Sequence, residues 1–355
     1  MVRIELGSVY NINDYDELAR MFLPRGEYAL AYEQAVVFEG VEAKLAKARE
    51  MYAALSAATG RTLPWGVLTG VKPLKKYAAV ADEGVLRSAY LVSDEKIALL
   101  RRVWERQRAC LPAVPAGSVS LYIGIPFCPS RCAYCTFPST VGSDREMGRY
   151  LTALYREMDF VFSGMRARGL WAESVYIGGG TPTALTNAML EDLLARVTDG
   201  VGGGRAGAGM EFTVEAGRPD TISYLKALTM AGAGVTRVSV NPQSLHERTL
   251  SAIGRRHLAS EYVEAMDTVR AAWRAAGCRS YEGVVVNTDV IAGLPGEAAT
   301  DFAQTLEGVL ACAPENVTVH TLSVKRGSKV REEAPEYSYS RTDGTAAEML
   351  RIADA

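Results

Sequence analysis

The chain has 355 residues, of which 48% are hydrophobic, and a formal net charge of −2 from 39 basic and 41 acidic side chains. Its length allows about two or three domains, and its near-neutral charge excludes a general surface for nucleic acid or anionic membrane. No apolar run approaches the ~20 residues of a membrane span, and the first residues, MVRIELG, lack the features of a signal peptide. We therefore expect a cytoplasmic protein with no nucleic-acid partner and no membrane span.

The first 112 residues predict a small α+β domain. Strand-like runs occupy 2–6 and 28–38, and apolar residues at helical spacing predict helices over 41–58 and 85–109. A turn-rich, basic segment, PWGVLTGVKPLKK, separates these two helices. The proline and glycine content of the following residues, 113–118, predicts a linker.

From residue 119 onward, strand-like and helix-like runs alternate. The strand-like runs start at 119, 174, 210, 235, 283 and 316, and the helix-like runs occupy 145–168, 187–197, 222–231, 261–276 and 298–311. This order favours a parallel α/β sheet with right-handed crossovers. We predict a partial (βα)6 TIM-like barrel over 119–330, with its chemistry at the carboxyl ends of the strands. Residues 331–355 predict the start of an incomplete C-terminal region, because the last of them begin a helix that has no cap.

Three cysteines follow the first strand of this barrel. Cys128, Cys132 and Cys135 have a CxxxCxxC spacing, and because iron–sulfur cubanes normally take four cysteines, three thiolates would leave one iron open to another ligand. So few cysteines in a long chain favour a reducing compartment and metal ligation over a disulfide framework. A zinc site, structural thiols and redox partners are the alternatives, although no histidine or cysteine follows within about a hundred residues to complete a zinc site. The remaining cysteines, at 110, 278 and 312, have contexts typical of core thiols.

A glycine triplet and a glutamate mark the ends of the second and third strands. Gly178, Gly179 and Gly180, followed by Thr181, let the backbone approach a ligand closely and present free amide and carbonyl groups. Glu215 ends the third strand, where its carboxylate can accept a hydrogen bond from an ammonium group. Taken alone, the triplet is a tight turn and the glutamate an ordinary strand-end charge.

Polar residues also follow the fourth strand and interrupt the fifth. Gln243 ends the fourth strand, and Arg255 lies twelve residues later, where its planar guanidinium can pair with a carboxylate. Arg256 is an adjacent competitor for that role. Asp289 is a carboxylate inside an apolar strand, and such a group is rarely buried without a partner. Ile291 follows it near the end of the same strand.

The CxxxCxxC loop after a first strand, followed by an α/β barrel, resembles the radical SAM superfamily. The resemblance implies that Cys128, Cys132 and Cys135 hold a 4Fe-4S cluster whose open iron binds S-adenosylmethionine (SAM). Electron transfer from the cluster then cleaves SAM to a 5′-deoxyadenosyl radical. The residues that it implies around SAM are Tyr134 and Ile291 at the adenine, Gly178, Gly179, Gly180, Thr181 and Glu215 at the methionine amino group, Arg255 at the carboxylate, and Gln243 and Asp289 at the ribose.

A narrower resemblance covers about residues 119–328. The segments YIGIPFC, GGGTPT, TVEAGRPD, NPQSL, IGRRH and DVIAGLP are similar, in this order, to the oxygen-independent coproporphyrinogen III oxidases, and PWGVLTGVKP and ENVTVHTLSVKRGS look like the HemZ-type branch. This implies oxidative decarboxylation of coproporphyrinogen III propionates to vinyl groups, giving protoporphyrinogen IX. It also implies an electron donor of flavodoxin or ferredoxin type, and we expect a monomer. Tyr122 matches a tyrosine near the cluster and substrate in that family.

Departures from the family pattern leave the substrate open. Gly124 stands where the best-characterised members have a histidine, and Thr136 and Phe137 stand where they carry a fourth cysteine. Most of their C-terminal substrate-covering domain lies outside this chain. The basic residues Lys325, Arg326, Lys329 and Arg331 can form a cationic rim for propionates or a solvated loop. Two alternatives therefore stand beside the decarboxylase: another radical SAM reaction on a tetrapyrrole, such as methyl transfer or haem opening, and a haem-trafficking protein of the same fold.

Overall fold

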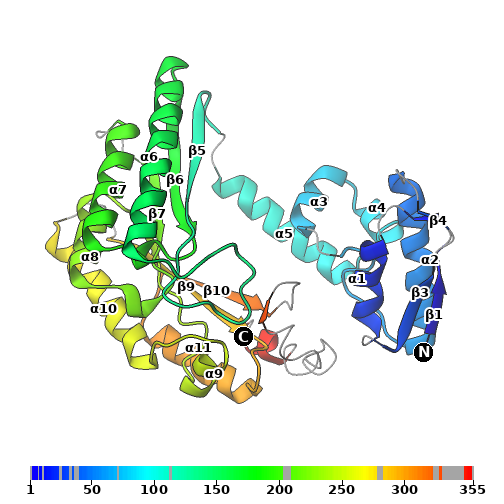
Figure 1. Cartoon of the computed structure of the whole chain (residues 1–355). Helices are drawn as coiled ribbons and strands as arrows, with labels where there is room; N and C mark the ends of the chain where they lie inside the picture. Colours follow the sequence, from blue (N-terminus) through cyan, green and yellow to red (C-terminus); the bar gives the residue numbers. More distant parts are fainter. Residues whose placement is uncertain are drawn as a thin grey trace. The chain divides into compact units, whose positions relative to one another are not determined.

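The structure is a computed structural model that describes most of the chain. The described residues are 2–6, 8–9, 12–23, 26–31, 34–35, 40–69, 72–111, 114–202, 209–277, 283–322, 328–329 and 348–353. They fall into two compact units, an N-terminal unit up to Val114 and a C-terminal unit from Pro115 onward (Figure 1).

The described residues of the N-terminal unit form short parallel strand pairs and five helices. Strand β1 (Val2–Glu5) pairs with β3 (Tyr28–Ala31), and β2 (Ser8–Val9) pairs with β4 (Gln34–Ala35). The helices are α1 (Ile12–Phe22), α2 (Val41–Thr59), α3 (Pro73–Val80), α4 (Glu83–Ser88) and α5 (Asp94–Cys110). Buried side chains of α1 and α2, including those of Tyr15, Leu18 and Leu55, form one apolar cluster. Leu86 of α4 and Ile97 of α5 belong to a second cluster.

Two expectations for this unit were wrong. The single helix expected over 85–109 is divided into α4 and α5, because Leu91 adopts a left-handed φ of 57° and the Ser93 side chain then caps α5 by accepting a hydrogen bond from the Lys96 amide. The segment expected to be turn-rich contains α3, which Pro73 begins at the first helical position. Strand β3 ends at Ala31, and most of the remaining strand expected up to 38 lies outside the described residues.

Six parallel strands form the sheet of the C-terminal unit. They are β5 (Ser118–Ile125), β6 (Trp171–Gly179), β7 (Glu211–Glu215), β8 (Arg237–Ser239), β9 (Val285–Ala292) and β10 (Asn316–Thr321), and each pairs with its neighbours in chain order. Within the described residues, β5 and β10 pair with one strand each. The predicted α/β class with a parallel sheet is confirmed, and all six expected strands are present.

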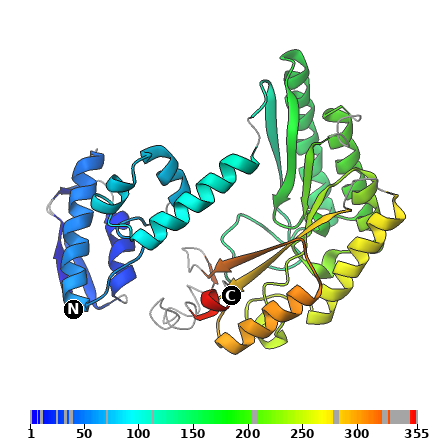
Figure 2. The same ribbon diagram turned by 180° about the vertical axis from the view of Figure 1, so that it is seen from behind.

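Helices cover one side of this sheet. They are α6 (Asp144–Ala167), α7 (Asn187–Gly200), α8 (Tyr224–Gly232), α10 (Ala259–Ala275) and α11 (Ala299–Ala311), with the short α9 (Glu247–Ala252) before α10. Figures 1 and 2 both show α6, α7, α8 and α10 along the same side. Hydroxyl caps start three of these helices: Ser143 forms a capping box with Glu146 at α6, and Thr186 and Ser223 cap α7 and α8.

The two faces of the sheet differ in character because side chains alternate along each strand. One set is apolar and buried against the helices, and includes Ile125, Ile177, Phe212 and Val286. The alternate set, on the opposite inner face, is mostly polar. At the end of the described chain, residues 348–353 are helical, and Met349 packs into the same core.

The turn after β6 packs directly on the chain that leaves β5. The Gly180 amide donates to the Ile125 carbonyl at 2.8 Å, and the Thr181 amide donates to the Phe127 carbonyl at 2.7 Å. A Cβ atom on Gly180 would lie 2.6 Å from the Phe127 oxygen and 2.8 Å from the Ile125 oxygen. Only glycine therefore allows these two backbones to come so close.

We expect Gly180→Ala to destabilise the chain by about 1–3 kcal/mol, because the added methyl group meets backbone that cannot rotate away. Gly148→Ala is the matched control. Gly148 lies within α6, and an added Cβ would meet only the Met189 Cε atom at 3.7 Å, so alanine should stabilise by about 0.5–1 kcal/mol. Urea unfolding followed by circular dichroism measures both, and equal effects of the two substitutions would contradict the close approach.

Candidate active site

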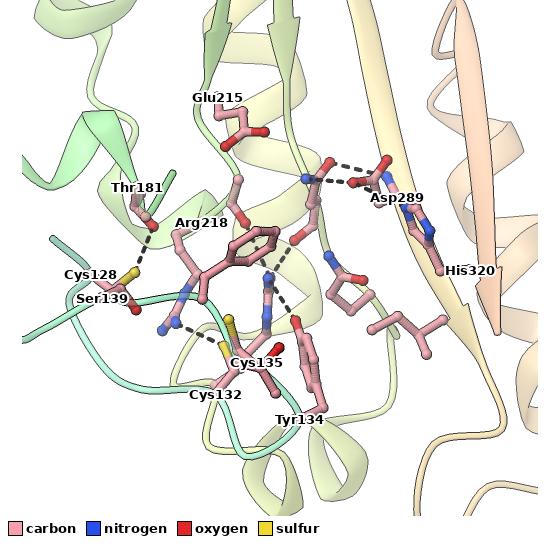
Figure 3. A pocket seen from close by; sticks show the side chains of 18 of the residues that line it. Cys128, Cys132, Tyr134, Cys135, Ser139, Thr181, Glu215, Arg218, Asp289 and His320 are labelled. Atoms are coloured by element: carbon pink, nitrogen blue, oxygen red, sulfur yellow. Dashed lines mark hydrogen bonds and ion pairs between the residues drawn. The ribbon is translucent and has the colours of Figure 1, made fainter. Parts of the chain in front are cut away.

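A pocket opens at the carboxyl ends of the six strands. Its volume is about 400 Å³, and most of the site residues predicted from the sequence line it (Figure 3). Those that line it are Cys128, Cys132, Tyr134, Cys135, Gly179, Gly180, Thr181, Glu215, Gln243, Arg255, Asp289 and Ile291. Tyr122 and Gly178 are not among the lining residues and stand beside them on β5 and β6.

The cysteine loop is held to other parts of the site by its backbone. The Cys128 amide donates to the Thr140 carbonyl at 3.0 Å, and the Ala133 amide donates to the Ile253 carbonyl at 2.8 Å. The Thr181 hydroxyl donates to the Cys128 sulfur at 3.6 Å, and burial raises the pKa of the Cys135 thiol. The three thiols thus face one pocket from a loop that is anchored at both ends.

The thiols fit an iron–sulfur cluster by the chemistry of their donor atoms. In the described part of the chain, no three histidine, cysteine, aspartate or glutamate side chains gather closely enough to hold a single metal ion. A cubane presents a separate iron to each cysteine, so its ligands need not converge on one point.

Two further cysteines among the described residues lie outside this pocket. Cys110 is exposed, so the prediction of a core thiol was wrong for it, and Cys312 is half-buried. Residue 278 lies outside the described residues.

Glu215 is oriented by two donors. Its carboxylate accepts a hydrogen bond from the Tyr176 hydroxyl and another from the Gly179 amide at 3.2 Å. Burial raises the pKa of this carboxyl, and the two donors oppose that shift. Gly178 makes room for the arrangement, because a Cβ there would lie 2.7 Å from the Tyr176 ring and 2.8 Å from a Glu215 oxygen. The Tyr176 ring also stacks on Tyr122, with ring centroids 5.9 Å apart and planes 14° apart.

Gln243 and Asp289 are joined through the backbone and through Asn241. The Gln243 amide donates to the Asp289 carbonyl at 3.1 Å, in a left-handed conformation with φ of 68°. The Asn241 side-chain amide donates to the Asp289 carboxylate at 3.0 Å, and its oxygen accepts from the Asp289 amide at 3.0 Å. The Gln243 side-chain oxygen is buried without a hydrogen-bond partner among the described residues. Such an acceptor is costly unless a ligand supplies the missing donor.

The two consecutive arginines after α9 differ in how far they are buried. Arg255 is buried in the pocket wall, whereas Arg256 is exposed. The Arg255 guanidinium donates to the carbonyls of Gly217 and Asn241 and, at 3.3 Å, to the Tyr134 hydroxyl. Its Nε has no partner in the described part of the chain. A bound acceptor would satisfy this donor.

Four side chains that contact the predicted site residues were not assigned to the site from the sequence. Arg218 donates to the Cys132 sulfur, Tyr176 to Glu215 and Asn241 to Asp289. His320, on β10, lies 3.7 Å from the Asp289 carboxylate, and this interaction raises the pKa of the imidazole. The segment TVEAGRPD contains Arg218, but nothing in its spacing indicates that the side chain turns toward the cysteine loop.

The basic residues expected to form a rim cannot be placed as a group. Lys325, Arg326 and Arg331 lie outside the described residues, and Lys329 is exposed.

Among the helices that the structure describes, none is both long and apolar enough to cross a bilayer.

Comparisons with known proteins identify the family of the chain and several relatives. Residues 122–309 match the family model of the radical SAM superfamily. The chain is 37% identical over 299 residues to the oxygen-independent coproporphyrinogen-III oxidase-like protein HemZ of Bacillus subtilis, covering 80% of this chain and 57% of that protein. It is 30% identical over 223 residues to the heme chaperone HemW of Mycobacterium tuberculosis, covering 61% of this chain and 53% of that protein.

A solved structure has a similar fold. Coproporphyrinogen III oxidase (HemN) from Escherichia coli superposes with a TM-score of 0.56 at 22% identity, over 68% of this chain and 52% of that chain. The chain spans about half the length of the curated relatives that it matches. The resemblance found in the sequence motifs is confirmed, and it implies a 4Fe-4S cluster and SAM as cofactors. By its matching motifs and fold, this chain belongs to the radical SAM superfamily.

Proposed function

We propose that the chain is a radical SAM enzyme that oxidatively decarboxylates propionate side chains of coproporphyrinogen III, giving protoporphyrinogen IX. One observation supports the catalytic part of the proposal: the three thiols share a pocket with charged and polar side chains that could bind the charged and polar groups of SAM. The substrate assignment rests on the similarity to the HemZ and HemN proteins named above. We further propose a cytoplasmic monomer with separate domains at 1–112 and 119–330, supplied with electrons by a flavodoxin- or ferredoxin-type donor.

The cofactor residues follow from what each side chain can offer. Cys128, Cys132 and Cys135 would ligate the cluster, which together with SAM supplies a carbon radical able to remove hydrogen from the substrate. Within the described residues, the Arg255 Nε and the Gln243 side-chain oxygen are buried without partners. The Nε would donate to an acceptor atom of SAM, and the oxygen would accept from a donor of SAM. Tyr134 and Ile291 would border the adenine.

Around these contacts, the remaining residues orient and enclose the ligand. Glu215 would receive the ammonium of SAM between the donors of Tyr176 and Gly179, and Asp289 would accept a ribose hydroxyl while Asn241 holds its carboxylate. The glycine turn at Gly179 and Gly180 would present backbone groups to the methionine amino end of SAM. Tyr122, 65% exposed beside Tyr176, would face the substrate. Each decarboxylation removes one hydrogen atom, one CO2 and one further electron, which passes to an acceptor.

The central test is anaerobic reconstitution with iron, sulfide, SAM and a reductant, with and without coproporphyrinogen III. We expect 5′-deoxyadenosine and a vinyl product from the wild-type chain, and neither from Cys132→Ala, because that variant lacks one cluster ligand. Cys110→Ala is the matched control, since Cys110 is an exposed thiol outside the pocket, and it should retain activity.

The other outcomes separate the alternatives. A methylated or ring-opened product without a vinyl product would replace the decarboxylase with another radical SAM reaction. The similarity to the heme chaperone HemW supports a haem-trafficking role as the second candidate function. Stoichiometric haem binding without 5′-deoxyadenosine would favour that role.

SAM binding should weaken as the pH falls. The pKa of Glu215 is raised by burial, so its carboxylate is protonated, and its attraction for an ammonium lost, at a higher pH than for an exposed glutamate. Glu215→Gln removes a charged hydrogen bond of about 1.5–3 kcal/mol, or about tenfold to a hundredfold in affinity, and should flatten this acid-side dependence. Equilibrium dialysis measures the affinity. Glu211→Gln, on the same strand but outside the pocket, should behave as wild type.

A further inference from the structure

Two buried cations contact the cysteine loop: Arg255 bonds the Tyr134 hydroxyl, and Arg218 bonds the sulfur of Cys132. Arg218 lies in the segment that follows β7 and is only 2% exposed. Its Nη1 donates to the Cys132 sulfur at 3.4 Å (Figure 3). The same Nη1 donates to the Ser130 carbonyl at 3.3 Å, and Nη2 donates to the Ser130 hydroxyl at 2.8 Å. Two of the three guanidinium nitrogens are therefore directed at the stretch between Cys128 and Cys132.

The charge of Arg218 is only partly balanced. Its Nε lies 3.4 Å from the Asp220 carboxylate, whose side chain is 21% exposed. The carboxylate is thus partly screened by water, whereas the guanidinium is not. Burying a cation is costly, and a single carboxylate with one long contact offsets that cost incompletely. A negatively charged group on the other side of the guanidinium would complete the balance.

We propose that Arg218 tunes the reduction potential of the cluster bound at Cys132. This inference rests on the proposed function, because it requires the cluster. Hydrogen bonds to ligand sulfurs and the net charge nearby are among the factors that set iron–sulfur potentials. Reduction adds one negative charge to the cluster, and a buried cation that bonds a ligand sulfur stabilises that charge in a poorly screened environment. Arg218 therefore raises the potential and makes the first electron easier to accept.

A purely structural role would predict a different result. If Arg218 only fastened the cysteine loop through Ser130, losing the Ser130 contact would matter as much as losing the charge. Ser130→Ala removes the 2.8 Å contact with Nη2 and also the bond from the Ser130 hydroxyl to the Gly254 carbonyl, but it keeps the guanidinium charge. The midpoint potential, unlike cluster content or activity, separates the two roles.

The experiment is a redox titration of the reconstituted chain, followed by electron paramagnetic resonance of the reduced cluster. We expect a more negative midpoint potential for Arg218→Met than for wild type, and a value near wild type for Arg218→Lys, Ser130→Ala and the distant control Arg237→Met. Asp220→Asn should shift the potential in the opposite, positive direction, because it removes the charge that balances Arg218. Iron and sulfide content is measured for each variant.

The results have distinct meanings. If wild type forms no cluster, the proposed function fails before Arg218 is tested, whereas an unchanged potential in a fully loaded Arg218→Met variant overturns only this inference. Equal shifts for methionine and lysine at position 218 also overturn it. If Arg218→Met does not retain a cluster, Asp220→Asn decides, since an unchanged or more negative potential there contradicts the proposed charge balance.

Discussion

All six strands of the C-terminal unit run in the same direction, so their carboxyl ends meet at one edge of the sheet. Every other feature of the site depends on this constraint. The cysteine loop, the glycine turn, Glu215, Gln243 and Asp289 belong to five successive strands, yet they line one pocket. The parallel sheet itself brings these five chain segments together, so the site does not depend on one long loop that carries all of its residues.

The cysteine loop is anchored by neighbours on both sides. The Phe127 carbonyl accepts from the turn after β6, and the Ser130 hydroxyl donates to the Gly254 carbonyl beyond α9. Arg218 adds a third attachment from the segment after β7. Segments that follow β6, β7 and α9 thus hold a loop that contains no regular secondary structure. Such preorganisation matters for a cluster site, because its ligands must be held in place before the cofactor arrives.

Much of the site could be predicted because strand ends are visible in the sequence. The apolar runs located all six strands, and the polar or glycine residues that follow them proved to share a pocket. Arg218, Asn241, Tyr176 and His320 could not be found in this way. Their partners come from other strands or loops, so their roles depend on register and loop conformation rather than on spacing along the chain. The division of the expected helix 85–109 also depends on one residue, Leu91, in a conformation that its side chain does not favour.

The inner face of the sheet, opposite the helices, differs in composition from the helix-covered face. Away from the pocket it is built from polar pairs, including Ser120 with Ser174 and Glu211 with Arg237. The large apolar core lies on the helix side, and a smaller buried cluster that includes Ile291 and Leu322 borders the pocket. The residues that line the pocket are therefore a different set from those of the large helix-side core. Substitutions on the inner face can alter ligand preference without disturbing the packed layer behind it.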